Sequence, residues 1–216
     1  MRRVPRQERS RRRVEAILQA AHALVVEHGS DQLKMSEVAT RANVPIGSVY
    51  QYFPDKQAIL RELALNLMAE VRDMLRVAMA NIGTKAEAVE RIDAVLQGYF
   101  EAFKSDPGKR DIWAATQSDK ELQQLDVEDS RANAQILAEG IGHLVAPQNQ
   151  ERMHSALLLF AHLAGSAARL AIAIEPDEGE RLMVALRESV RHQMDALLES
   201  RKPSPSQPQG TRASSQ

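Results

Sequence analysis

Residues 36–53, SEVATRANVPIGSVYQYF, constrain the fold more than any other stretch, because they read as two short helices joined by a tight turn. Ala39 lies where the two helices must approach closely. Asn43 falls in the turn, where we expect a positive φ, which asparagine tolerates best after glycine. Val49 is placed to pack the second helix onto the first. This spacing predicts a helix-turn-helix unit, whose second helix enters the major groove of DNA.

The surface of the second short helix agrees with that interpretation. Gly47 lets the backbone come close to DNA, and Ser48 and Gln51 can hydrogen-bond base edges or phosphates. Tyr50 and Tyr52 are long, stiff side chains that can reach a phosphate or pack on a thymine methyl group. These five residues are therefore candidate DNA contacts.

Two neighbouring residues complete the unit. We expect Phe53 to turn inward and close a three-helix core. Lys56, at the start of the next helix, can meet a phosphate, and the helix N-terminus adds positive potential. The alternative is a plain aromatic core element, although three of the eight aromatic residues within four positions are then unexplained.

Helical signals continue along the rest of the chain, and no convincing alternating strand is present. Ser10 is a candidate N-cap for the first helix, and Asp55 begins a long amphipathic one. Thr84 and Glu87 have the spacing of a capping box at the start of another. In total the pattern predicts an all-α chain of about nine helices.

Charge and composition suggest three regions. Residues 1–13 hold seven arginines and one glutamate, although the whole chain has a net charge of −1. A basic arm on a mildly acidic body suggests a polyanionic partner for the N-terminal part, and a solvated tail is the alternative. We expect a basic arm and helix-turn-helix domain over 1–56, a longer helical domain over 57–202, which the family resemblance described below implies to be a ligand-binding and dimerisation domain, and a disordered Pro/Ser/Gln-rich tail over 203–216.

Compartment and chemistry are constrained more weakly. The chain has no cysteine, which suits a reducing interior, and its arginine-rich start does not resemble a signal peptide. The apolar run 156–174 approaches bilayer-spanning length, but His162 and Arg169 interrupt it and favour a buried helix. No metal-ligand spacing, nucleophile elbow, P-loop or dinucleotide fingerprint is evident. We therefore expect a cytoplasmic protein that is not an enzyme and carries no metal or cofactor.

The stretch VATRANVPIGSVYQYFPDK resembles the signature of the tetracycline-repressor (TetR) family. The resemblance implies a homodimeric, all-helical transcriptional regulator, usually a repressor that a small-molecule ligand releases from a palindromic operator. By position, it implies DNA contacts at Ser36, Ile46, Gly47, Ser48, Tyr50, Gln51, Tyr52 and Lys56. The chain departs from the family pattern at Lys34 and Ser36, which replace the usual helix cap and one usual phosphate-contacting residue, and at Asn43, Pro45 and Ile46.

The resemblance also implies a ligand cavity among the helices of 57–174. We expect Tyr99, Phe103, Trp113 and His162 to line it, because aromatic side chains with a few polar groups suit a small-molecule pocket. Plain core packing is the alternative. Arg169 can pair with a ligand carboxylate or, as we prefer, with an acidic side chain of the same dimer.

Dimerisation is predicted through the last two helices. Ala161, Gly165 and Ala168 lie along one side of the helix over 150–174 and would allow a second helix to approach closely. Burial of this side within one subunit is the alternative. A ligand would then change the spacing between the two helix-turn-helix units of the dimer. The long helix from Asp55 would connect the ligand cavity to each unit.

Other functions remain open on the sequence alone. The runner-up within the same class is a ligand-independent or activating regulator. The fold is also compatible with a helical ligand-binding or scaffold protein that has lost DNA binding. The effector, the operator and the sign of regulation are not encoded in any pattern that we can interpret.

Overall fold

The computed structural model describes residues 4–116 and 120–198, and these residues form an all-α protein, as predicted. The predicted disordered tail over 203–216 lies outside the described residues. The nine α-helices of the described part are α1 (Val4–His28), α2 (Met35–Arg41), α3 (Ile46–Tyr52), α4 (Lys56–Ala78), α5 (Lys85–Ser105), α6 (Pro107–Thr116), α7 (Lys120–Ile141), α8 (Gln150–Ala173) and α9 (Pro176–Leu198). Short 3₁₀ turns occupy Ser30–Gln32, Gly142–Leu144 and Pro147–Asn149.

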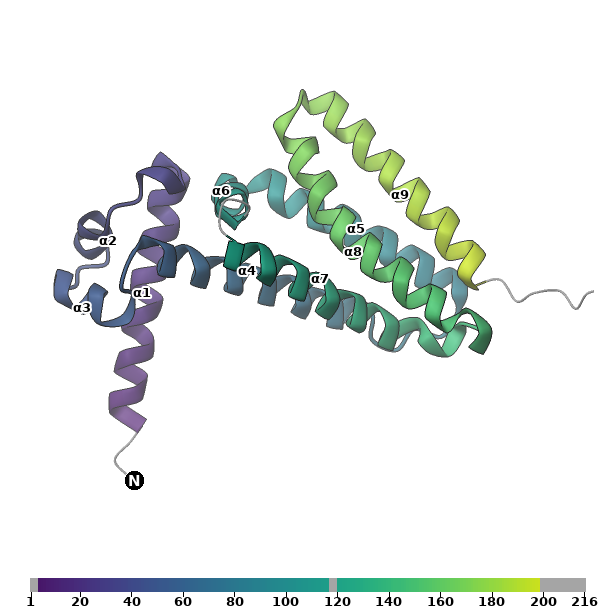
Figure 1. Ribbon diagram of the computed structural model, residues 1–216, viewed down its shortest axis with the longest axis horizontal. Helices are drawn as coiled ribbons and strands as arrows, with labels where there is room; N and C mark the ends of the chain where they lie inside the picture. Colours follow the sequence, from purple (N-terminus) through teal and green to yellow (C-terminus); the bar gives the residue numbers. More distant parts are fainter. Residues whose placement is uncertain (1–3, 117–119, 199–216) are drawn as a thin grey trace, which may run out of the picture.

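Helices α1, α2 and α3 form a small unit at one end of the molecule (Figure 1). Its core also takes in the first turns of α4, and Ile17, Val38, Val49 and Ile59 are completely buried there. The spacing of these apolar residues is helical, so each helix turns one stripe inward. We call this unit the reading head.

The longer helices form a second unit, which we call the effector region. Helix α4 leaves the reading head and runs beside α7, while α8 packs against both α7 and α9 (Figure 1). Its core is built from apolar residues of α4, α5, α7, α8 and α9.

Helix α6 lies between the two units and contacts both (Figure 1). Ile112 belongs to the core of the reading head. The next residue, Trp113, packs instead with Leu67, Met68 and Phe103 of the effector region. Successive residues of one short helix therefore face the two units.

The start of α1 differs from the prediction. The helix begins at Val4 and not after Ser10, so most of the basic arm is helical. Arg, Gln and Glu are good helix formers, and Pro5 is tolerated in the first turn, where its missing N–H costs nothing. The Ser10 hydroxyl instead donates to the Tyr52 hydroxyl at 3.0 Å, so it joins α1 to α3.

The other predicted local features are confirmed. Asp55 caps α4 by accepting from the backbone N–H of Ala58 at 2.8 Å. The Thr84 hydroxyl accepts from the N–H of Glu87, whose carboxylate accepts from the N–H of Gly83 at 2.9 Å. Asn43 has φ 53°, as the turn between α2 and α3 requires.

Helix α8 differs from the expected buried helix. The stretch Pro147–Ala173 is long and apolar enough to cross a membrane, and only 22% of its most apolar window is buried within the protein. One face packs inside the subunit, whereas Leu159, Leu163 and Leu170 are exposed. The sequence did not reveal this division, because α8 is apolar on nearly all sides.

Candidate DNA-reading head and effector cavity

Helix α3 presents an open outer face. Val49 is completely buried and Phe53 is 6% exposed, so both point into the core, as predicted. Tyr50 on the opposite side is 53% exposed and Ile46 is 43% exposed. A side chain added at Gly47 would meet nothing within 4 Å, so the helix backbone is accessible there. This face can enter a groove without moving the core.

The remaining predicted contacts on this surface differ in exposure. Gln51 and Ser36 are exposed, and Ser48 is partly buried. Helix α2 has Lys34 at its N-cap position, where it makes no side-chain capping bond, in line with the departure from the family pattern. Lys34 instead pairs with Glu37 at 3.0 Å.

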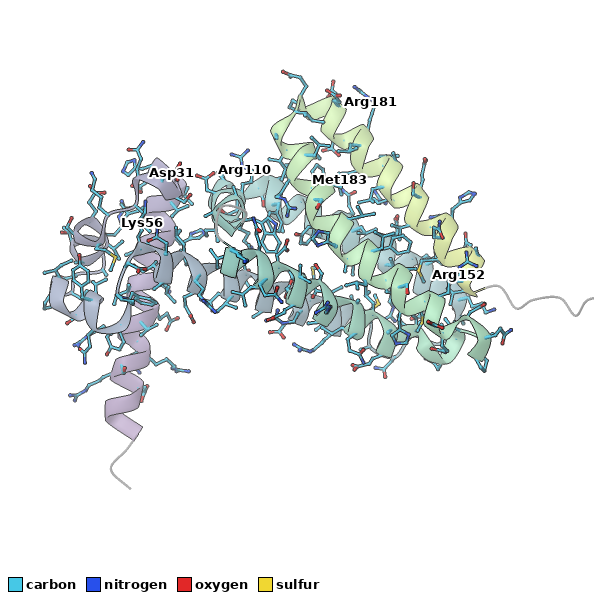
Figure 2. The ribbon with its side chains drawn as sticks, in the orientation of Figure 1. Asp31, Lys56, Arg110, Arg152, Arg181 and Met183 are labelled. Atoms are coloured by element: carbon cyan, nitrogen blue, oxygen red, sulfur yellow. The ribbon has the colours of Figure 1, made fainter. Side chains whose placement is uncertain are left out.

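Tyr52 and Lys56 are held by partners inside the protein. Tyr52 packs partly against the core, and its hydroxyl accepts the bond from Ser10. The Lys56 ammonium donates to the backbone carbonyl of Asp31 at 2.9 Å, and the two residues lie side by side in Figure 2. Ser10 and Asp31 were not among the candidate residues, because each is more than 20 positions from its partner. The DNA-contact roles of all eight residues remain predictions.

Positive charge lies beside α3. Arg9, Arg11, Arg12 and Arg13 are all exposed on α1. The Ser10–Tyr52 bond fixes this part of α1 next to the C-terminal end of α3. Arg12 pairs with Glu8 on the same helix. Exposed arginines on a helix that contacts α3 are what binding to a phosphate backbone requires.

The effector region encloses a cavity of about 70 Å³. By the same measure one water molecule needs ~10–15 Å³, so the cavity has room for several waters or a small organic molecule. Tyr99, Trp113 and His162 line it, as predicted. Phe103 does not. It is buried behind the wall, with its ring centroid 4.7 Å from that of Tyr99 and 6.0 Å from that of Trp113.

Four buried polar residues of α7 also line the cavity, and sequence reasoning missed them: Asp126, Asp129, Ser130 and Asn133. Their spacing of i, i+3, i+4 and i+7 places them on one face of the helix. That pattern looks like a solvated face in the sequence. The signal that could have found them is their position opposite an apolar helix that carries His162 and Arg169.

These polar groups form a connected set. Asp129 pairs with Arg72 of α4 and accepts from the Asn133 amide at 2.8 Å. The Ser130 hydroxyl and His162 Nδ1 lie 3.1 Å apart. Burial raises the pKa of Asp129 above its ordinary value, although Arg72 opposes the shift. Burial likewise raises the pKa of the Tyr99 hydroxyl, which therefore stays protonated as a donor.

Arg169 does not line the cavity, but it lies next to the lining residues Gly165 and Trp113. Its Nη2 donates to the Ser166 hydroxyl at 2.9 Å, and its guanidinium carbon is 5.9 Å from the centre of the Trp113 ring. Its Nη1 is buried without a hydrogen-bond partner among the described residues. The described part of one subunit therefore offers no ion pair for it.

The small-residue side of α8 does not face outward, so the reason given for dimerisation through it is wrong. Ala168 is buried against α5 and α9, and Ala161 and Gly165 line the cavity. The exposed apolar surface of α8 and α9 is made instead by Leu159, Leu163, Leu170 and Val184. We call these four residues the leucine face.

Comparisons with known proteins agree with this architecture. Residues 17–63 match the family of bacterial regulatory proteins of the tetR type, and residues 86–198 match the tetracyclin repressor-like C-terminal domain. The HTH-type transcriptional regulator BetI of Agrobacterium fabrum is 28% identical over 145 residues, which cover 65% of this chain and 69% of BetI.

Solved structures show the same fold. A TetR-family regulator from Streptomyces coelicolor aligns with a TM-score of 0.67 at 24% identity, over 88% of this chain and 99% of that one. The SmeT–triclosan complex aligns with a TM-score of 0.62 at 18% identity, over 85% and 90% of the two chains. With both halves matched, the chain belongs to the TetR family and is a DNA-binding transcriptional regulator.

Proposed function

We propose that this protein is a cytoplasmic, homodimeric repressor that a small molecule releases from a palindromic operator. In this proposal, residues 1–56 read DNA and residues 57–202 bind the effector and the second subunit. The helix α3 of each subunit enters one major groove. Contacts to DNA are offered by residues on the open side of α3, namely Ile46, Gly47, Ser48, Tyr50 and Gln51, and by Ser36 of α2. Tyr52 and Lys56 support α3 and its flank.

The observation that carries the proposal is the position of α6. Ile112 is buried in the reading head, and Trp113 lines the cavity one residue later. A ligand that displaces Trp113 must therefore act on a helix whose preceding side chain, Ile112, is packed in the core of the reading head. Because packed cores respond in discrete steps, a small movement at the cavity can reorient the reading head.

A second contact strengthens that connection. A side chain added at Gly108 of α6 would lie 2.6 Å from a methyl group of Val26, so α6 and α1 are in tight contact. His22 of α1 lies 3.4 Å from the carboxylate of Asp106, just before α6. The coupling therefore has a route through α6 into α1, beside the long helix α4.

Dimerisation is supported by the leucine face. Its residues recur at i, i+4 and i+11 on α8, with Val184 on the neighbouring α9. Two helices with one shared apolar surface can pair with their copies in an isologous interface. That arrangement would carry two reading heads at a fixed separation, as a palindromic operator needs.

The triclosan complex of a structurally similar protein supports a ligand in the effector cavity. The test has two steps. Operator sequences are first selected from random DNA and bound in fluorescence anisotropy. Candidate effectors are then titrated while operator release and Trp113 fluorescence are followed together, since Trp113 is the only tryptophan.

Binding and release must be reciprocal, so both signals should change over the same concentration range. Selection of no operator would refute the proposal. A ligand that occupies the cavity and leaves operator affinity unchanged would favour the ligand-independent alternative. A ligand that strengthens transcription from a bound promoter would favour an activator.

A further inference from the structure

An unused cationic donor lies beside the aromatic end of the cavity, next to the lining residue Gly165. Nη1 of Arg169 is buried without a partner among the described residues. A methyl group added at Gly165 would lie 3.4 Å from this nitrogen, 3.5 Å from the Tyr99 hydroxyl and 3.8 Å from Cζ2 of Trp113. Because Gly165 has no side chain, space remains beside two hydrogen-bond donors, Arg169 Nη1 and the Tyr99 hydroxyl, and beside the ring of Trp113.

An unpaired donor of this kind is costly. Burial of a charged group without its hydrogen bonds costs more than burial of a neutral group. The ring of Trp113 offsets part of the cost by a cation–π contact. Oδ1 of Asn133 is also buried without a hydrogen-bond partner in the described part of the chain, but it is neutral, and one water molecule can satisfy it. A ligand group that accepts a hydrogen bond from Arg169 therefore gains more binding free energy than one that bonds to Asn133.

Two acidic and two cationic side chains gather at the cavity. Asp126 and Asp129 line it, Arg72 pairs with Asp129, and Arg169 lies next to the lining residue Tyr99. When an anion binds, a carboxyl group at the cavity can take up a proton. A guanidinium cannot lose its proton in a protein, so a cationic ligand has no equivalent compensation.

The opposite end of the cavity is apolar. Leu96, Leu137, Leu157 and Val190 line it, and all four are buried. We propose that the effector is an amphiphilic carboxylate, whose head group pairs with Arg169 and accepts from the Tyr99 hydroxyl, and whose hydrocarbon body lies among these residues. This inference rests on the proposed function only in treating the cavity as the effector site.

The test compares three probes of equal chain length: octanoate, the neutral octanamide and the cationic octylammonium. Binding to the full-length protein is measured by titration calorimetry and by Trp113 fluorescence, without DNA. We expect octanoate to bind at least about tenfold more tightly than octanamide, and octylammonium to bind most weakly. Equal binding of octanoate and octanamide, tighter binding of octylammonium, or no binding of octanoate would overturn the proposal.

Substitutions at two residues, Gly165 and Arg169, locate the head group. Gly165→Ala fills the space beside Arg169 at ordinary contact distances, so it should fold and yet lose most of the preference for octanoate. Arg169→Met should abolish that preference, and Arg169→Lys should restore part of it. Arg131→Met, on the exposed side of α7, makes the same chemical change away from the cavity and should leave the preference intact.

Melting curves identify any variant that fails to fold, and Gly165→Ala then carries the test, because alanine favours a helix more than glycine does. An unchanged octanoate preference in folded Gly165→Ala and Arg169→Met would overturn the proposal. The DNA assay separates this inference from the proposed function. Octanoate that binds through Arg169 without releasing DNA supports the ligand class and contradicts the repressor mechanism. If octylammonium releases DNA and octanoate does not, the repressor mechanism is supported and the proposed ligand class is contradicted.

Discussion

The reading head and the effector region place their polar groups in opposite ways. The reading head has an apolar core of residues such as Ile17 and Val38, and its predicted DNA contacts stand outside on α3. The effector region encloses Asp126, Asp129, Ser130 and Asn133 within its helices. Among these four residues, Oδ1 of Asn133 is buried without a hydrogen-bond partner in the described part of the chain, so a ligand can add a bond there.

In the proposed mechanism, helix α6 couples the two units. Ile112 packs in the core of the reading head and Trp113 packs in the effector region. Because packed cores respond in discrete steps, we expect the reading head to move as one body. Substitutions in the two regions should therefore differ in their effects on operator affinity, subunit association and the free energy of unfolding.

The first prediction concerns the surface that joins two subunits. Leu163 on the leucine face is 39% exposed in the single chain, and Leu163→Glu should place a charge at the centre of the proposed interface. We expect a monomer in sedimentation and a loss of operator affinity of about 100-fold or more, because the second reading head is no longer linked to the first.

The matched control lies two residues along the same helix. Gly165 faces the cavity, so Gly165→Ala should remain a dimer and keep its operator affinity without ligand. A dimer that persists in Leu163→Glu would show that the subunits pair through another surface.

The second prediction contrasts two aromatic residues of the reading head. Tyr50→Ala removes a side chain that is 53% exposed, so melting should stay near wild type while operator affinity falls by about tenfold or more. Phe53→Ala empties a core position and should destabilise the protein by about 3–5 kcal/mol. Circular dichroism with anisotropy checks both. Early melting of Tyr50→Ala would mean that α3 is turned the other way.

The two regions also differ in how well the sequence predicts them. The turn at Asn43, the buried faces at Val49 and Phe53, and the caps at Asp55 and Thr84 follow from local spacing, and all are confirmed. These features depend on interactions within a few residues, which sequence patterns record directly.

The effector cavity depends on long-range packing and was predicted only in part. Tyr99, Trp113 and His162 were identified, whereas the polar face of α7 was not. The prediction that Gly165 faces a second subunit was wrong. A helix that is apolar on all sides gives no indication of which side packs inside the subunit. The bonds of Tyr52 to Ser10 and of Lys56 to Asp31 likewise join distant segments.

The third prediction concerns an ion pair between α5 and α9 in the effector region. Hydrogen bonds from Arg187 lower the pKa of Asp93 below its ordinary value, and Arg191 lies 3.6 Å away. A lowered carboxyl pKa stabilises the fold above the unfolded-state pKa of about 4, and this contribution is lost as pH falls through the folded-state value.

Asp93→Asn should therefore lower the free energy of unfolding by about 1–2 kcal/mol at pH 7, and the difference from wild type should shrink in acid. Asp73→Asn, which breaks the exposed pair with Arg76, should change it by about 0.5 kcal/mol or less at either pH. Denaturant titrations at pH 7 and pH 3 measure both. An Asp93→Asn deficit that persists at pH 3 would point to lost packing in place of lost charge.

The smallest effect compares one backbone feature that both regions share. Asn43 in the reading head and Asn81 before α5 have φ values of 53° and 56°, and the side chains of both are exposed. Glycine adopts this conformation without the steric cost of a β-carbon, so each Asn→Gly change should stabilise its region by about 0.5 kcal/mol. Asn→Ala should destabilise each by about 1 kcal/mol, because alanine lacks the local hydrogen bonds that help asparagine there.

Since Val49 and the bond from Val44 N–H to the Ala39 carbonyl hold α3 in place, operator affinity should not change in Asn43→Gly. Thermal melting and anisotropy test the pair. A gain at Asn81 with a loss of affinity at Asn43 would mean that the Asn43 side chain, and not only its backbone, takes part in reading DNA.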